Sequence, residues 1–312
     1  MTTYRLPPGP APVRSLWQKI QTTWNYNRNG IHLLMATQRQ YGDVYNWQMD
    51  DNHLYIIVHP DDIHRVLVTD AASYHKTPDY TDPDTGLAMF LGSGILTSDG
   101  EFWRRQRKLM QPAFHTKRIE AYADIMVEQT EQMLERWASY TRLDIDQEMM
   151  RLTLLIVAQA LFHNNVEAEA DLIGEGVTAL QYANAEAFLP RWLPTPNRWR
   201  ARRVLVRLNE IIYRLIRERR ESGIVDKGDL LSMLLLAQDD DGVGMTDKQI
   251  RDEVMTIILA GHETTANAMN WTWYLLSQHR EVEAKLHVEV DTVLGGRLPT
   301  LADLKQMPYA EW

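Results

Sequence analysis

Apolar residues recur with helical spacing over most of the chain after residue 100. Apolar side chains three or four positions apart form one face of an α-helix, so this pattern predicts a largely helical protein. A short helix is also expected from Thr300, and Pro308 is typical of the first turn of another. The longer helices are expected at residues 101–110, 116–139, 147–163, 167–187, 197–222, 227–237, 246–278 and 280–294.

The first 100 residues follow a different pattern. A helix is predicted over residues 31–41. Apolar and polar residues then alternate over 44–49, and a second apolar run at 54–58 follows an Asp-Asp-Asn turn, which together predict a β-hairpin. Prolines and glycines at 70–100 predict a long loop. The expected fold class is therefore mainly α with a small β-sheet.

The predicted helix over residues 246–278 is unusually long. Thr246 followed by Gln249 is a capping-box pattern, which fixes its start. At 1.5 Å per residue the helix is about 50 Å long and crosses a whole domain. In its middle stands the sequence Ala-Gly-His-Glu-Thr-Thr, at residues 260–265. An acid and two hydroxyls interrupt an apolar stripe there, beside a glycine that lets a large group come close.

Three interpretations of this motif differ in chemistry. A zinc protease needs a second histidine four residues after His262, but that position is Ala266, so zinc is excluded. The motif can be a polar patch against a neighbouring helix, with Thr264 bonded back to the backbone. Alternatively, the helix lies against a flat cofactor and handles protons there.

Trp103 and Arg107 form a second candidate site. They are four residues apart and share one helical face. An indole N–H and a guanidinium are both pure hydrogen-bond donors, so the pair suits an anion. The alternative is a solvated basic face in which Trp103 only anchors the helix in the core.

Composition and net charge exclude several classes of function. The 312 residues are 45% hydrophobic and 24% charged, with a net charge of −9, which argues against a nucleic-acid-binding protein. An arginine-rich stretch at 198–220 is interpreted as a solvated helix face. No apolar run approaches the roughly 18–20 residues of a membrane span, and early prolines do not fit a signal peptide. The absence of cysteine excludes disulfides and thiolate metal sites within the chain and suits a cytoplasmic location.

Taken in order, these motifs resemble the cytochrome P-450 family of haem-thiolate monooxygenases. The long-helix motif matches that family's [AG]-G-x-[DE]-T-[TS] pattern, and Trp103 with Arg107 matches its W-x-x-x-R pattern. Further matches are the proline-rich start at 6–10, Gln-Pro-Ala-Phe at 111–114, the leucine-rich helix at 229–235 and Gly-Gly-Arg-Leu-Pro-Thr at 295–300.

The resemblance implies roles for residues around a haem. Trp103 and Arg107 would hold the haem propionates. Ala260 and Gly261 would lie over the distal face of the haem, and Thr265 would belong to the same cofactor-binding surface.

The resemblance also implies a catalytic relay and partners. Glu263 and Thr264 would deliver protons for the activation of O2. The loops at 76–100 and 188–199 would line the entrance for a small hydrophobic organic substrate. Electrons would come from a ferredoxin or flavodoxin with its reductase, and neither nucleic acid nor a membrane anchor is implied.

The sequence departs from the family at its C-terminal side. The family's E-x-x-R helix and its cysteine-bearing haem loop would follow Trp312. We therefore expect one incomplete domain over residues 1–312, with a proline-rich segment at 1–30 and the long distal helix at 246–278. Without a cysteine this chain alone is expected to be inactive. The alternative is a haem-free helical binding or interaction protein built on the same fold.

Overall fold

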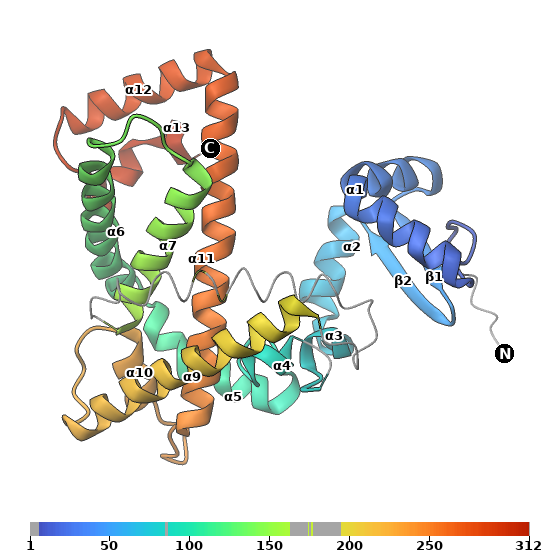
Figure 1. The fold of residues 1–312 in the computed structure, drawn as a ribbon, viewed down its shortest axis with the longest axis horizontal. Coiled ribbons are helices and arrows are strands. Elements are labelled where there is room, and N and C mark those ends of the chain that lie inside the picture. Colours follow the sequence, from blue (N-terminus) through green and yellow to red (C-terminus); the bar gives the residue numbers. More distant parts are fainter. Residues whose placement is uncertain (1–5, 85–86, 163–173, 175, 177–194, 312) are drawn as a thin grey trace. The chain divides into compact units, whose positions relative to one another are not determined.

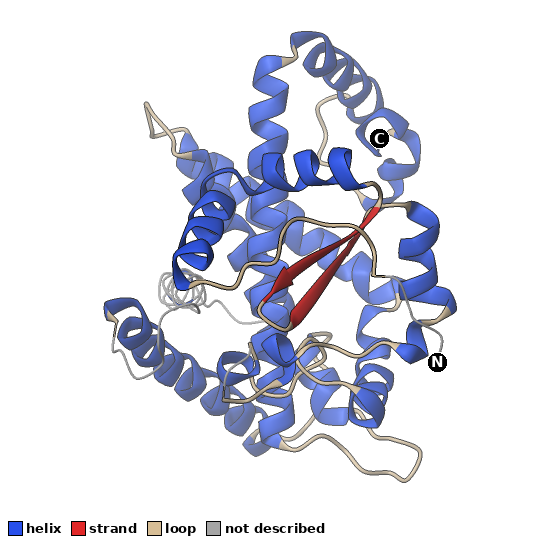
Figure 2. Cartoon of the chain, turned by 90° about the vertical axis from the view of Figure 1, so that its right-hand side faces the viewer, coloured by secondary structure: helices blue, strands red, loops and turns tan. Residues whose placement is uncertain are grey.

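The computed structural model describes residues 6–84, 87–162, 174, 176 and 195–311. Helices dominate these residues, and one β-hairpin accompanies them (Figures 1 and 2). The expected fold class, mainly α with a small sheet, is confirmed. The elements are α1 (Leu16–Tyr41), β1 (Val44–Met49), β2 (Asn52–Ile57), α2 (Pro60–His64), α3 (Pro78–Thr81), α4 (Ala88–Leu91), α5 (Gly100–Met110), α6 (Thr116–Trp137), α7 (Ile145–Phe162), α9 (Pro196–Glu221), α10 (Leu230–Leu236), α11 (Asp247–Gln278), α12 (Arg280–Leu294) and α13 (Pro308–Glu311), with short helical turns η1 (Arg65–Thr69), η2 (Ala71–Ser73), η3 (Gln111–Phe114) and η4 (Leu301–Gln306).

The chain divides into two compact units, Met1–His75 and Lys76–Trp312. The single domain expected over residues 1–312 stays a prediction. None of the helices in the described residues combines the length and the apolar character that crossing a bilayer requires. The helix predicted over 167–187 lies almost entirely outside the described residues.

The first unit is built on the predicted hairpin. β1 and β2 pair in antiparallel register, with Trp47 opposite Leu54. The backbone of Val13 joins the edge of β1, where its N–H donates to Gln48 O at 3.0 Å. Tyr45 on β1 is fully buried and provides the unit's central aromatic side chain.

One boundary in this unit was predicted wrongly. The helix expected over 31–41 begins at Leu16. Ser15 caps the helix by accepting from the Gln18 N–H, and the Gln18 side chain bonds back to the Ser15 backbone. The apolar residues of this first half are interrupted by Gln, Thr and Asn, which hides the helical period. A kink at Asn29 separates the two halves.

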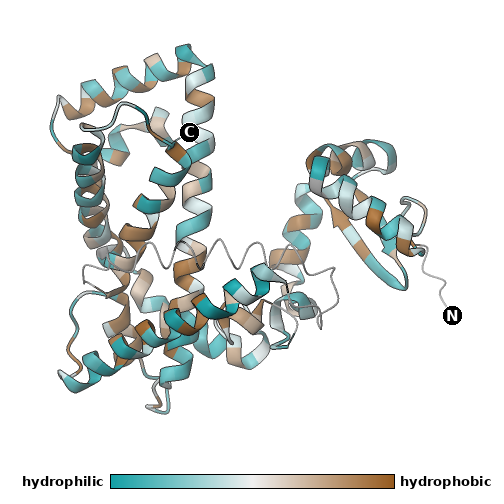
Figure 3. Cartoon of the chain, in the orientation of Figure 1, coloured by the Kyte–Doolittle hydropathy of each residue, from teal (hydrophilic) through white to brown (hydrophobic). Residues whose placement is uncertain are grey.

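The second unit is centred on the contact between α7 and α11. Figure 1 shows these two helices side by side in the second unit, with α6 against the other side of α7. Apolar residues concentrate where α11 passes the other helices of the unit (Figure 3). The largest core cluster includes Leu154 and Ala158 of α7, Leu208 of α9, Leu231 of α10, and Val254 of α11.

Short sequence signals set the start of α11 and the end of α12. Thr246 accepts from the Gln249 N–H at 3.2 Å, and the Gln249 side chain accepts from the Thr246 N–H at 2.8 Å, which confirms the predicted capping box of α11. Gly295 ends α12 in the left-handed conformation, at φ 57°. The predicted long loop at 70–100 contains the short helices α3 and α4 and the turn η2, and α5 begins at its last residue, Gly100.

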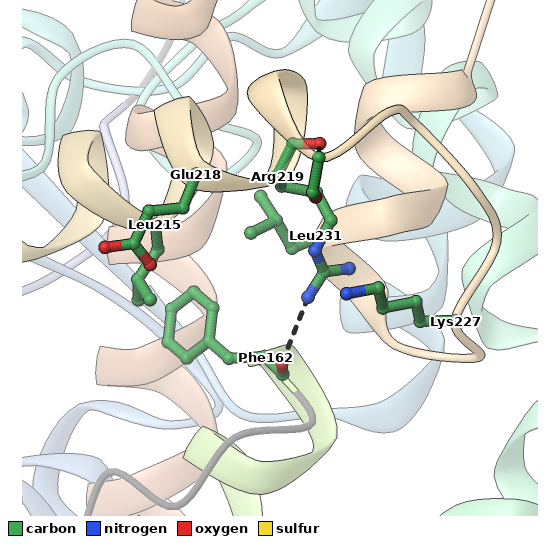
Figure 4. Close-up of a pocket in the computed structure, with 7 residues that line it drawn as sticks. Phe162, Leu215, Glu218, Arg219, Lys227 and Leu231 are labelled. Carbon is green, nitrogen blue, oxygen red and sulfur yellow. Dashed lines mark hydrogen bonds between the residues drawn. The ribbon is translucent and has the colours of Figure 1, made fainter.

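A buried ion pair joins the end of α9 to the start of α10. Arg219 donates from Nη2 to Asp229 Oδ2 at 2.7 Å and from Nη1 to Oδ1 at 2.9 Å. Arg219 also donates to the carbonyl oxygen of Phe162 at 3.1 Å, beside a cavity of about 200 Å³ (Figure 4). Burial raises the pKa of Asp229, but hydrogen bonds from Arg219 and Ser232 outweigh it and leave this pKa below its usual value.

Candidate functional site

The motif in the middle of α11 has a face that packs against α7. A Cβ placed on Gly261 would lie 2.8 Å from Cγ2 of Val157, so the glycine permits a close helix–helix approach. His262 is 2% exposed, and its carbonyl accepts from Thr153 Oγ1 at 3.0 Å. Burial lowers the pKa of His262, which keeps the imidazole neutral near pH 7. Gly261 and His262 of the motif therefore pack against α7.

The other face of the motif is open. Ala260, Thr264 and Thr265 are exposed, in contrast to His262 and Ala266 between and after them. Thr264 Oγ1 donates to the carbonyl of Ala260 at 2.6 Å, so the hydroxyl oxygen keeps its lone pairs for a partner outside the helix. Glu263 is half-buried beside it. The small side chain of Ala260 leaves room for a flat group against this face.

The role of Gly261 yields a stability prediction. Gly261→Ala should destabilise the protein by about 1–3 kcal/mol, because a methyl group must be forced into the packed contact with Val157. Thermal or urea denaturation measures this change. In a Val157→Ala background the penalty should shrink, since the space for the methyl group then exists. An equal loss in both backgrounds would show that the contact with α7 does not require the glycine.

Trp103 and Arg107 lie together as the spacing predicts. The Arg107 guanidinium carbon is 5.2 Å from the centre of the Trp103 ring. Arg107 is exposed and Trp103 is half-buried, while Leu109 and Met110 near the end of α5 are buried in the core. The helix therefore fixes one aromatic and one cationic donor at the surface, which suits an anion such as a carboxylate.

A second cation, which no sequence pattern indicates, lies beside Trp103. Nζ of Lys76 lies 5.6 Å from the centre of the Trp103 ring. It donates to the carbonyls of Ile95 and Ser98, at 2.7 and 2.8 Å. Burial lowers the pKa of Lys76, although the charges of Asp99 and Glu253 oppose this. Lys76 is far from Trp103 in sequence, so no local spacing could reveal that it adds positive charge to the site.

Three consecutive charged residues at the start of α11 were also missed. Arg251, Asp252 and Glu253 are each less than 9% exposed. All three side chains form hydrogen bonds with the backbone of residues 90–95. Glu253 and Ala260 are seven residues apart and share one face of the helix. Of the three charged residues, Glu253 therefore belongs to the same face as the open middle of α11.

The open face of α11 and the donors on α5 suit a haem in some respects and not in others. The flat exposed strip at Ala260 fits a macrocycle, and Trp103, Arg107 and Lys76 offer donors and positive charge for its propionates. The chain contains no cysteine, so these 312 residues do not supply a thiolate for the iron. Gly261 fits less well as a cofactor contact, because its free side faces Val157.

Comparisons with known proteins agree with this class of fold. The family model of cytochrome P450 matches residues 7–312. Cyclooctatin synthase from Streptomyces melanosporofaciens is 38% identical over 287 residues, which are 89% of this chain and 61% of that protein. Pentalenene oxygenase from Streptomyces avermitilis is 33% identical over 309 residues, 97% of this chain and 66% of that protein.

A solved structure shares the fold. The retinoic acid bound cyanobacterial CYP120A1 superposes with a TM-score of 0.82 at 20% sequence identity, covering 99% of this chain and 68% of that one. Helices packed around the long helix α11, with an open strip in its middle and donors on α5, characterise the second unit. The chain belongs to the cytochrome P450 family. It spans about three fifths of the length of the relatives it matches.

Proposed function

We propose that the chain forms the O2- and substrate-binding side of a haem-dependent monooxygenase. The observation that carries the proposal is the open strip at Ala260 and Thr264, set in the middle of a helix whose other side is packed against α7. One face of α11 is buried against α7. The other face presents a hydroxyl beside a small residue, and this combination suits a flat ligand. Family membership supports the same conclusion.

When bound, the haem would supply the redox chemistry that activates O2. The residues of this chain would position it and move protons. Arg107 and Lys76 would bind its carboxylates, and Trp103 would add an indole N–H. The Thr264 hydroxyl would accept a hydrogen bond at its Oγ1, and would donate one after turning away from the Ala260 carbonyl. Glu263, the preceding residue, would replace the proton that it gives up.

The proposed substrate is a small hydrophobic organic molecule. The name pentalenene oxygenase states oxygenation of such a compound for one relative. Electrons would come from a ferredoxin or flavodoxin with its reductase. Because the chain has no cysteine, any haem that it binds alone should give a carbon-monoxide spectrum without thiolate character, and the chain alone should hydroxylate nothing.

Haem titration of the purified chain tests whether Trp103 and Arg107 bind the haem carboxylates. Arg107→Ala should weaken haem binding about 10- to 100-fold, which corresponds to the roughly 1.5–3 kcal/mol of a hydrogen bond to a charged group. Lysine at this position should restore binding only in part, since it lacks the planar fork. Arg104 is the matched control: it is exposed on the same helix and pairs with Glu101. Equal effects of Arg107→Ala and Arg104→Ala would favour the solvated-face interpretation.

The second candidate function is a haem-free binding or interaction protein. Its support is the large exposed apolar surface of the second half of α11, which includes Trp271 and Trp273. The same titration separates the two candidates. A folded chain that binds no haem at micromolar concentration would favour the interaction protein.

A further inference from the structure

The segment Phe90–Asp99 is pressed directly onto the start of α11. Gly92 has φ 78°, and a Cβ there would lie 2.1 Å from a carboxylate oxygen of Asp252. A Cβ on Gly94 would lie 2.4 Å from Oγ1 of Thr256 and 2.8 Å from the carbonyl of Asp252. Glycine at both positions is therefore a condition for this contact.

Side chains of α11 hold the segment through its backbone. The Ser93 N–H donates to Asp252 at 2.9 Å, and the Ile95 N–H donates to Oε2 of Glu253 at 2.9 Å. Arg251 donates to the carbonyls of Leu91 and Phe90, at 3.0 and 3.2 Å. These bonds fix where the backbone of the segment lies and do not depend on the chemistry of its side chains.

The segment is also held from its other side. Lys76 donates to the carbonyls of Ile95 and Ser98, and its own N–H donates to Asp99 at 2.8 Å. Within the segment, Thr97 Oγ1 donates to the carbonyl of Gly92 at 2.6 Å. The segment is thus a compact unit clamped between Lys76 and the acids of α11, and Glu253 lies underneath it.

Among the residues that hold the segment, Glu253 has the least favourable environment. Its side chain is fully buried, and its Oε1 has no hydrogen-bond partner among the described residues. An ionised carboxylate with an unpaired buried oxygen is costly, and hydration would remove the cost. Residues 90–98 carry no ionisable side chain, so the charges acting on Glu253 are those of Asp252 and Lys76.

We propose that Phe90–Asp99 is a proton-linked gate over the open face of α11, and that Glu253 is the positioning residue through which the proton acts. Below neutral pH, Glu253 is protonated when the segment is closed over it. When the segment lifts, water reaches the carboxyl and the proton leaves. Since Glu253 shares its helical face with Ala260, lifting the segment lengthens the open strip. The use of this opening to admit an organic substrate rests on the proposed function.

The direction of the pH effect follows from the pKa of Glu253. Burial raises this pKa from 4.5 to about 7 in the closed state, with a smaller contribution from Asp252 and opposing ones from the Ile95 N–H and Lys76. In the open, hydrated state the ordinary value returns. The closed state therefore binds more protons, so opening becomes more favourable as the pH rises through this interval. Between pH 5 and 8 the opening constant should rise roughly 50- to 100-fold.

Amide hydrogen exchange of the purified chain tests the gate without haem. After correction for the intrinsic rate, the protection factor of the Ile95 amide should fall roughly 50- to 100-fold from pH 5 to pH 8. It should stay well below that of Leu154 in the core of α7 at each pH. Glu253→Gln should remove the pH dependence, because glutamine still accepts the bond but does not ionise.

Two further variants separate the gate from a general loss of structure. Asp252→Asn weakens the bond to Ser93 but leaves Glu253 to titrate, so Ile95 should be less protected and still depend on pH. Gly94→Ala should expose the Ile95 amide at every pH while Leu154 stays protected. A pH dependence that survives in Glu253→Gln, or equal protection of Ile95 and Leu154, would overturn the gate. Neither result depends on haem binding, which tests the proposed function separately.

Discussion

Replacing Thr264 with alanine is expected to lower the product formed per reductant consumed by about tenfold or more. Proton transfer by a positioned side chain typically contributes 10²–10⁴-fold, and water that replaces the hydroxyl would restore part of it. The measurement needs a thiolate-ligated haem. We would make it in a chimera that joins this chain to the remaining length of cyclooctatin synthase, once the chimera shows the carbon-monoxide spectrum of such a haem.

The chain offers a matched control for this substitution. Thr272 lies two turns further along α11, and its Oγ1 donates to the carbonyl of Ala268 at 2.9 Å, the same bond that Thr264 makes to Ala260. Thr272→Ala removes that bond without touching the motif, and coupling should not change. Thr264→Ser keeps the hydroxyl and should retain most of the coupling. Full coupling in Thr264→Ala would disprove the proposed relay.

Loss of the buried ion pair between α9 and α10 is expected to be the largest stability effect. Arg219→Ala should lower the free energy of unfolding by about 3–5 kcal/mol, because Asp229, only 1% exposed, then keeps a buried charge without its partner. Denaturant titration of the purified chain measures the loss. The double variant with Asp229→Ala should lose less than the sum of the two single changes.

Arg217 is the control for this prediction. It is exposed on α9, two residues before Arg219, and forms no ion pair with the residues that the structure describes. Arg217→Ala should change stability by no more than about 0.5 kcal/mol. A comparable loss in both variants would mean that helix propensity, rather than the buried pair, stabilises this region.

Features governed by neighbours along the chain could be predicted from sequence. The capping box at Thr246 and Gln249 needs only three residues of spacing, and the structure contains both of its bonds. Trp103 and Arg107 meet because one helical turn brings them together. The start of α1 was missed because polar residues interrupt its apolar stripe and leave only the cap at Ser15 as a signal.

The fold class and the two candidate motifs were thus determined by local sequence, since helical period, caps and one-turn contacts act over a few residues. Which face of α11 is buried was decided by the tertiary structure. Gly261, which suggested a large ligand, faces Val157, while the open strip runs through Ala260 and Thr264. Lys76 and Glu253 joined the site only because folding brings distant segments together. Burial and charge pairing depend on such contacts, and the order of residues along the chain does not contain them directly.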